Sequence, residues 1–218
     1  LGIKDNTIVI FMTDNGPQHV RYVAGMKGRK SSVYNGGIRV PFFLRFPAMF
    51  SGNQEVDQIT AHIDLLPTLS KLCNVEMPRD RKIDGRSFIP SINRKKLPER
   101  SFFSYWTRKY PELFNNIALQ RGQFKLIGKT NYNSPIENFE LYDTYKDPFE
   151  KNNLIAQKKS IGLALKKEMH QTFLELVNSE NLKNPPRIIL GSDFENPVFL
   201  NRNDAGGQRA VWNQEQAY

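Results

Sequence analysis

Two side chains with hard oxygen donors, Asp14 and Asn15, directly follow an apolar run and precede a turn. The run is Thr-Ile-Val-Ile-Phe-Met-Thr at residues 7–13, and the turn is Gly16-Pro17. Adjacent strand residues point to opposite faces, so the two side chains can share one ion only where the chain bends, as Gly-Pro allows. Carboxylate and amide oxygens suit Ca²⁺ or Mg²⁺. The pair is a candidate metal site, although on its own it fits a plain turn better.

Two apolar segments and a glycine-rich loop are expected to position this pair. We expect a strand near residues 6–13, a loop up to Gly37 and a second strand at 38–46. Both segments are continuously apolar, which is typical of a parallel sheet covered by helices on both faces. A helix should begin after Asp64, which can cap it. The helix side chains expected to turn inward are Leu65, Leu69 and Leu72.

A charged linker at residues 93–100 precedes a different pattern. Short aromatic or branched segments at 102–106, 116–120, 124–127 and 139–143 are separated by turn residues, which is typical of an antiparallel sheet. Apolar residues at helical spacing then predict a helix from Ser160 to Asn178, with an inward stripe of Ile161, Leu165, Met169, Phe173 and Leu176. We therefore divide the chain into residues 1–95 in an α/β domain, an α+β subdomain at 96–180 and a tail at 181–218.

Three blocks, in this order, resemble the type I sulfatases, the formylglycine-dependent and arylsulfatase-like members of the alkaline phosphatase superfamily. They are Thr-Asp-Asn-Gly at residues 13–16, the segment 25–41 ending in Tyr-Asn-Gly-Gly-Ile-Arg-Val-Pro, and Ile-Asp-Leu-Leu-Pro-Thr-Leu at 63–69. Lys-Leu-Ile at 125–127 and Glu-Leu-Tyr-Asp at 140–143 extend the resemblance. It implies the C-terminal part of an α/β sandwich with a mostly parallel sheet, followed by a subdomain with an antiparallel sheet and a long helix.

The resemblance also implies roles for single residues. Asp14 and Asn15 would bind the active-site Ca²⁺, with Mg²⁺ less suited, and Lys30 would be a catalytic cation that contacts the sulfate group. His19, four residues after Asn15, is a candidate for substrate contact. The chain departs from the family pattern at two positions: it has Asn35 where Glu is usual, and Ser31 where Gly is usual.

No Cys-x-Pro-Ser-Arg segment, the source of the formylglycine nucleophile in this family, occurs in the sequence. The single cysteine, Cys73, ends an apolar helix, where we expect a small buried residue. The chain has no initiator Met and no visible signal segment. We therefore expect it to need a missing N-terminal half of the same protein and to be inactive alone. The resemblance implies a periplasmic or secreted location.

The charge balance restricts the partners. The chain carries 31 Lys and Arg against 22 Asp and Glu, a formal charge of +9, which attracts polyanions. The basic residues are scattered and form no nucleic-acid motif, so we expect a sulfated small molecule or glycan and no nucleic acid. No apolar run approaches a transmembrane span of roughly 20 residues. Two alternatives stay open: a phosphoesterase or phosphonate hydrolase of the same superfamily, and a non-catalytic polyanion-binding protein.

Overall fold

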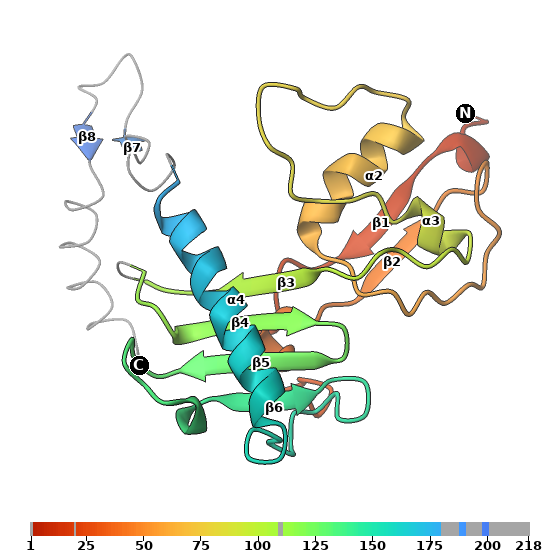
Figure 1. Ribbon diagram of the computed structural model, residues 1–218. Coiled ribbons are helices and arrows are strands. Elements are labelled where there is room, and N and C mark those ends of the chain that lie inside the picture. The colour runs from red at the N-terminus through yellow and green to blue at the C-terminus, as the bar shows by residue number, and fades with distance from the viewer. Residues whose placement is uncertain (1, 20, 109–110, 180–187, 191–197, 201–218) are drawn as a thin grey trace.

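The computed structural model describes residues 2–19, 21–108, 111–179, 188–190 and 198–200 (Figure 1). Its strands are β1 (Val9–Met12), β2 (Phe42–Arg45), β3 (Ser101–Tyr105), β4 (Asn115–Arg121), β5 (Phe124–Lys129), β6 (Glu140–Asp143), β7 (Ile188–Leu190) and β8 (Val198–Leu200). Its α-helices are α1 (Asn35–Ile38), α2 (Leu65–Leu72), α3 (Ile89–Ile92) and α4 (Lys159–Val177). Short 3₁₀ turns lie at Lys4–Asn6, His62–Asp64 and Ile136–Asn138. Apart from β7 and β8, the tail at 181–218 lies outside the described residues.

The antiparallel sheet expected in the second half is present. Strands β3, β4, β5 and β6 are neighbours in chain order, and each pair is antiparallel. The helix expected at 160–178 is α4, which packs across one face of this sheet. Its Leu165, Met169 and Phe173 are buried in one core with sheet residues such as Leu119, Leu126 and Leu141. Leu176, the last member of the expected stripe, is exposed, and the neighbouring Val177 packs against the core in its place.

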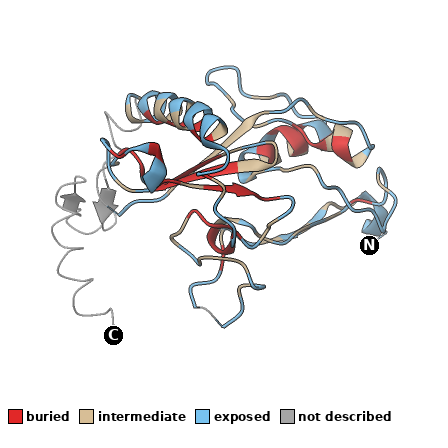
Figure 2. Cartoon of the chain, turned by 60° about the horizontal axis from the view of Figure 1, so that its bottom comes forward, coloured by how far each residue is buried: buried red, intermediate tan, exposed pale blue. Residues whose placement is uncertain are grey.

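The opposite face of the same sheet packs on the glycine-rich loop. Because strand side chains alternate, Ala118, Ile127 and Tyr142 point away from α4. They form a second buried cluster with Val33 and Tyr34 of the loop. In Figure 2 the strands of the sheet, largely coloured as buried, lie between the long helix and looped chain. The subdomain sheet is therefore a support for the loop that contains Lys30.

The two strands expected near residues 6–13 and 38–46 are present as β1 and β2, but their expected parallel arrangement is wrong for this pair. They pair with each other in antiparallel register, from Val9 opposite Arg45 to Met12 opposite Phe42. A continuously apolar strand indicates apolar surroundings but does not encode strand direction. The second strand also starts later than expected, because Asn35–Ile38 forms α1.

Helix α2 follows Asp64 as expected, but the Asp64 side chain does not cap it. A 3₁₀ turn at His62–Asp64 precedes the helix, so Asp64 already has helical backbone angles and not the extended ones of an N-cap. Its buried carboxylate instead accepts the Ala61 N–H at 2.9 Å and the Arg86 N–H at 2.8 Å, and it pairs with Arg100. Asp64 thus joins three segments.

Several apolar residues of α2, and the cysteine that follows it, are less buried than the sequence predicts. Leu72 is buried, whereas Leu65 and Leu69 are half-buried. Cys73 is exposed, contrary to expectation, because the helix ends at Leu72 and turns its next residue to solvent.

None of the helices in the described part of the chain is long and apolar enough to cross a membrane.

Candidate functional site

The end of β1 carries the two candidate metal ligands side by side. Asn15 Nδ2 donates to Asp14 Oδ1 at 2.7 Å and to the Gly16 carbonyl at 3.4 Å. These bonds occupy the amide nitrogen of Asn15. No described residue donates a hydrogen bond to Asn15 Oδ1 or Asp14 Oδ2. The bend places both side chains on one side of the chain. The pair offers hard oxygen donors of the kind a divalent ion prefers.

Two backbone hydrogen bonds join this turn to the glycine-rich loop. The Gly16 N–H donates to the Gly37 carbonyl at 2.8 Å, and the Lys30 N–H donates to the Pro17 carbonyl at 3.0 Å. Lys30 has an exposed side chain, as does Asp14. The structure therefore places the backbone of Lys30 next to the turn that carries Asp14 and Asn15, although 13 residues lie between Gly16 and Lys30 in the sequence.

Glycines are needed where the turn and the loop touch. A Cβ atom on Gly16 would lie 1.8 Å from the Gly36 carbonyl oxygen, and one on Gly36 would lie 2.3 Å from the Gly28 carbonyl oxygen. Cβ atoms do not approach carbonyl oxygens this closely. The backbone of the turn therefore packs directly on the backbone of the loop, and only glycine permits the contact.

Two histidines from separate segments lie in different surroundings. His19 is exposed, and within the described part of the chain no hydrogen bond links it to Asp14, Asn15 or Lys30. His62, which comes from the segment before α2, has its Nε2 3.1 Å from the Thr13 carbonyl, one residue before Asp14. A second histidine therefore lies beside the candidate metal ligands. Its position before the Ile-Asp-Leu-Leu block was the only sequence signal for it.

Ser31, next to Lys30, has a left-handed backbone with φ of 71°. This conformation costs a residue with a Cβ about 1 kcal/mol and costs glycine little. We expect Ser31→Gly to raise the free energy of unfolding by about 0.5–1 kcal/mol in chemical denaturation. Ser160→Gly, at an exposed position in α4, is the matched control and should lower it by a similar amount. A Ser31→Gly variant that is less stable than the parent would contradict the strain argument.

Lys27 is bound to the subdomain and is not a free cation of the loop. Its Nζ donates to Glu140 Oε2 and to Tyr142 Oη, each at 2.9 Å, and lies 4.3 Å from the centre of the Tyr34 ring. Burial and the hydrogen bond to Glu140 raise the pKa of Tyr34 and of Tyr142, so both phenols stay protonated. Burial acts to raise the pKa of Glu140, but bonds from Tyr142, Lys27 and Tyr34 hold it below its usual range.

A second network beneath the loop is fully buried. Lys125 of β5 and Glu150 form an ion pair with Nζ–Oε1 at 2.7 Å, and neither side chain is exposed. Both also hydrogen-bond Asn35 of the loop. Neither Lys125 nor Glu150 was predicted from the sequence as a site residue. The available signal was a lysine on the loop-facing side of an otherwise apolar strand.

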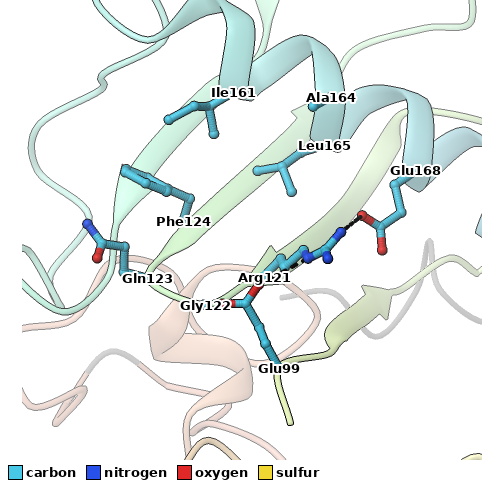
Figure 3. Close-up of a pocket in the computed structure, with 9 residues that line it drawn as sticks. All are labelled: Glu99, Arg121, Gly122, Gln123, Phe124, Ile161, Ala164, Leu165 and Glu168. Carbon is cyan, nitrogen blue, oxygen red and sulfur yellow. Dashed lines mark hydrogen bonds and ion pairs between the residues drawn. The ribbon is translucent and has the colours of Figure 1, made fainter.

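A separate shallow hollow lies between the sheet and α4. Figure 3 shows Arg121 there between Glu99 and Glu168, with Phe124, Ile161 and Leu165 beside it. Arg121 pairs with Glu99 at 3.1 Å and with Glu168 at 3.4 Å. The hollow lies on the α4 face of the sheet, away from the loop, and its cation, Arg121, is already paired. This hollow is therefore not part of the candidate site.

The described residues contain no complete candidate metal site. They include no group of three or more His, Cys, Asp or Glu side chains that could hold an ion. Asp14 and Asn15 provide two oxygen donors, whereas Ca²⁺ takes roughly six to eight. The two residues present fit a hard divalent ion by donor type, and further ligands would have to come from other parts of a protein.

The fold, with an antiparallel four-stranded sheet and a long C-terminal helix, is shared with solved sulfatase structures of the alkaline-phosphatase-like class. The family model described as N-sulphoglucosamine sulphohydrolase, C-terminal, matches residues 28–179. The chain therefore belongs to the sulfatase family, and it matches the C-terminal region of that family.

Individual relatives agree with this family. The chain is 29% identical over 188 residues to an N-acetylgalactosamine-6-O-sulfatase of Bacteroides thetaiotaomicron, which covers 74% of this chain and 35% of the relative. It is 29% identical to human arylsulfatase A, over 72% of this chain and 35% of that protein. A solved sulfatase structure from work on glycosaminoglycan metabolism by B. thetaiotaomicron aligns with a TM-score of 0.61 and 25% identity, over 78% and 39% of the two chains. The chain thus spans little more than a third of these relatives.

Proposed function

We propose that this chain is the C-terminal part of an enzyme that hydrolyses sulfate esters, with a sulfated carbohydrate or aryl compound as substrate. The observation that supports this most directly is the pair of hydrogen bonds that join the Asp14–Pro17 turn to the loop of Lys30. They place the backbone of Lys30 next to the turn that carries the two oxygen donors. The names of relatives that act on amino-sugar sulfates favour a carbohydrate as the first substrate class to test.

The chain's own residues would act by binding charge. In this proposal Asp14 and Asn15 hold Ca²⁺, and Lys30 contacts the sulfate group, with His19 as a further contact. A bound divalent ion supplies positive charge that stabilises the oxygens of the transferring group. The Lys30 ammonium adds a fixed positive charge to the same group, which lowers the barrier most where water is excluded. The formylglycine nucleophile and the remaining metal ligands would come from the N-terminal half of the protein.

The surface of β1 and β2 is consistent with a larger catalytic domain. Phe11 and Phe43 lie opposite each other in register, their ring centres are 6.1 Å apart, and they are 61% and 65% exposed. Large apolar side chains paired on an open sheet face are expected to be covered. We propose that the N-terminal half of the protein covers this face. Residues 1–95 would complete its α/β domain, residues 96–180 would be the subdomain and 181–218 a tail.

The full polypeptide that contains this chain provides the test. We expect it to release sulfate from an aryl sulfate and from sulfated amino-sugar oligosaccharides, at rates that fall when Ca²⁺ is chelated, and we expect the 218-residue chain alone to be inactive. Faster hydrolysis of phosphate or phosphonate esters would identify the phosphoesterase alternative instead. Salt-sensitive binding to heparin without hydrolysis would identify a polyanion-binding protein. We further propose export to a periplasm or to the cell exterior, as the family resemblance implies.

A further inference from the structure

A buried ion pair attaches the loop of residues 25–37 to the sheet, and the proposed reaction does not use it. Lys125 Nζ lies 2.7 Å from Glu150 Oε1, and neither side chain is exposed to solvent. The pair also holds Asn35: Lys125 Nζ donates to Asn35 Oδ1 at 3.1 Å, and the Asn35 N–H donates to Glu150 Oε2 at 2.7 Å. Asn35 Nδ2 donates to the Pro148 carbonyl at 2.9 Å. One loop residue is thus fixed by three hydrogen bonds.

Such a network is stable only when it is complete. Removing two charges from water is costly, and a buried pair recovers that cost only if each charged atom has a partner. Here both Glu150 oxygens accept a hydrogen bond, and Lys125 Nζ has two acceptors. Burial lowers the pKa of Lys125, while the Glu150 carboxylate acts in the opposite direction. Loss of either charge would leave the other buried without its counter-ion.

The neutral amide of Asn35 suits this place. A carboxylate there would set two negative charges against the single Lys125 cation. It would also remove the N–H group that the Pro148 carbonyl accepts. The amide instead accepts from Lys125 and donates to Pro148, so it completes the network without adding charge. The departure of this chain from the usual Glu at position 35 therefore has a physical basis in the network itself.

A short path of backbone contacts connects this network to Lys30. Asn35 begins α1, and the Gly36 N–H donates to the Lys27 carbonyl at 2.7 Å, which closes the loop on itself. The Gly37 carbonyl accepts from Gly16, in the turn beside Asn15. The Lys30 N–H is bonded to that same turn through the Pro17 carbonyl. A shift of Asn35 therefore displaces both the loop and its contact with the candidate metal ligands.

We propose that Lys125 and Glu150 are positioning residues: by holding Asn35 they fix the 25–37 loop so that Lys30 stays beside Asp14 and Asn15. This inference rests on the proposed function for what Lys30 does there. The attachment of the loop can be measured separately from any reaction, through hydrogen exchange of its backbone amides. In this proposal the subdomain affects the site only by fixing the position of the loop, and Lys125 and Glu150 do not contact the substrate.

The test uses the full polypeptide with Lys125→Met, Glu150→Gln and the double variant. Lys159→Met is the matched control, because Lys159 also forms an ion pair, with Glu137, but on the exposed surface of α4. We expect each single variant to speed amide exchange in residues 27–37 by at least about tenfold while residues 165–173 keep their protection. We expect kcat for an aryl sulfate to fall about tenfold or more. The double variant should regain only part of both losses, because it leaves no charge unpaired but still lacks the hydrogen bond from Lys125 to Asn35.

The outcomes separate this inference from the proposed function. Equal acceleration of exchange in both segments would mean that the pair only stabilises the fold, and it would overturn the inference. Wild-type exchange and kcat in Lys125→Met would overturn it as well. If the parent protein releases no sulfate but exchange in 27–37 still responds as expected, the proposed function fails and the attachment of the loop by this pair stands. Lys159→Met should leave both measurements unchanged.

Discussion

Asp14→Ala in the full polypeptide is expected to lower kcat for an aryl sulfate by about a thousandfold or more, with a much smaller change in KM. Asp14 is one of only two candidate metal ligands in the described residues, and its carboxylate carries the only formal negative charge of the pair. Losing the ion removes charge stabilisation that is needed mainly in the transition state, so the effect should appear in kcat. Steady-state kinetics together with the bound calcium content measure both consequences.

Asp57→Ala is the matched control, because Asp57 is also an exposed aspartate and no hydrogen bond or ion pair joins it to the described residues Asp14, Asn15 and Lys30. It should retain the kinetics and calcium content of the parent. An Asp14→Ala enzyme with the parent's kcat would show that the metal assignment is wrong. A variant that keeps its calcium but loses kcat would place Asp14 in a different role, such as direct contact with the substrate.

Gly16→Ala should have the second largest effect, although it adds only one methyl group. That methyl carbon would sit 1.8 Å from the Gly36 carbonyl oxygen, so the turn and the loop must move apart. Overpacking of this kind costs about 1–3 kcal/mol of stability. A displacement of about 1 Å between reacting groups also reduces turnover by about a hundredfold. We therefore expect lower stability in chemical denaturation and a kcat lowered by about a hundredfold in the folded fraction.

Gly52→Ala provides the comparison for this substitution. Nothing lies within 4 Å of a Cβ at Gly52, and its φ is not positive, so the same added methyl group should leave stability and kcat nearly unchanged. If Gly16→Ala behaved like Gly52→Ala, the close packing of turn and loop would not be required for the site.

The sequence predicts those elements whose pattern is local. The four-stranded sheet follows from short aromatic or branched segments between turn residues, and α4 follows from helical spacing, so their extents are close to the expected ones. The ligand pair Asp14 and Asn15 is local too, since a bend after the strand brings the side chains together. The proposed role of Lys30, by contrast, came from resemblance, because no property of one loop lysine distinguishes it.

The remaining features depend on partners far apart in the chain. The burial of Lys125 depends on Glu150, 25 residues later, and on Asn35, 90 residues earlier. A charged side chain in a strand is normally assigned to solvent, and only such partners reverse that assignment. The direction of β1 against β2 and the junction formed by Asp64 are also tertiary features. The local sequence around Asp64 predicts a helix cap. Its buried carboxylate instead accepts a hydrogen bond from the Arg86 N–H and forms an ion pair with Arg100.

The support of the loop by the subdomain sheet also sets an order of folding. Asn35 is joined to Glu150 across 115 residues, and Lys27 to Glu140 across 113. Contacts of such long range form late, because the intervening chain must first be closed into place. During synthesis the lysine loop emerges long before the strands on which it rests. The candidate site is therefore translated before the residues that support it, and the loop of Lys30 is attached to the sheet through Asn35 only after Glu150 has been made and the strands have folded.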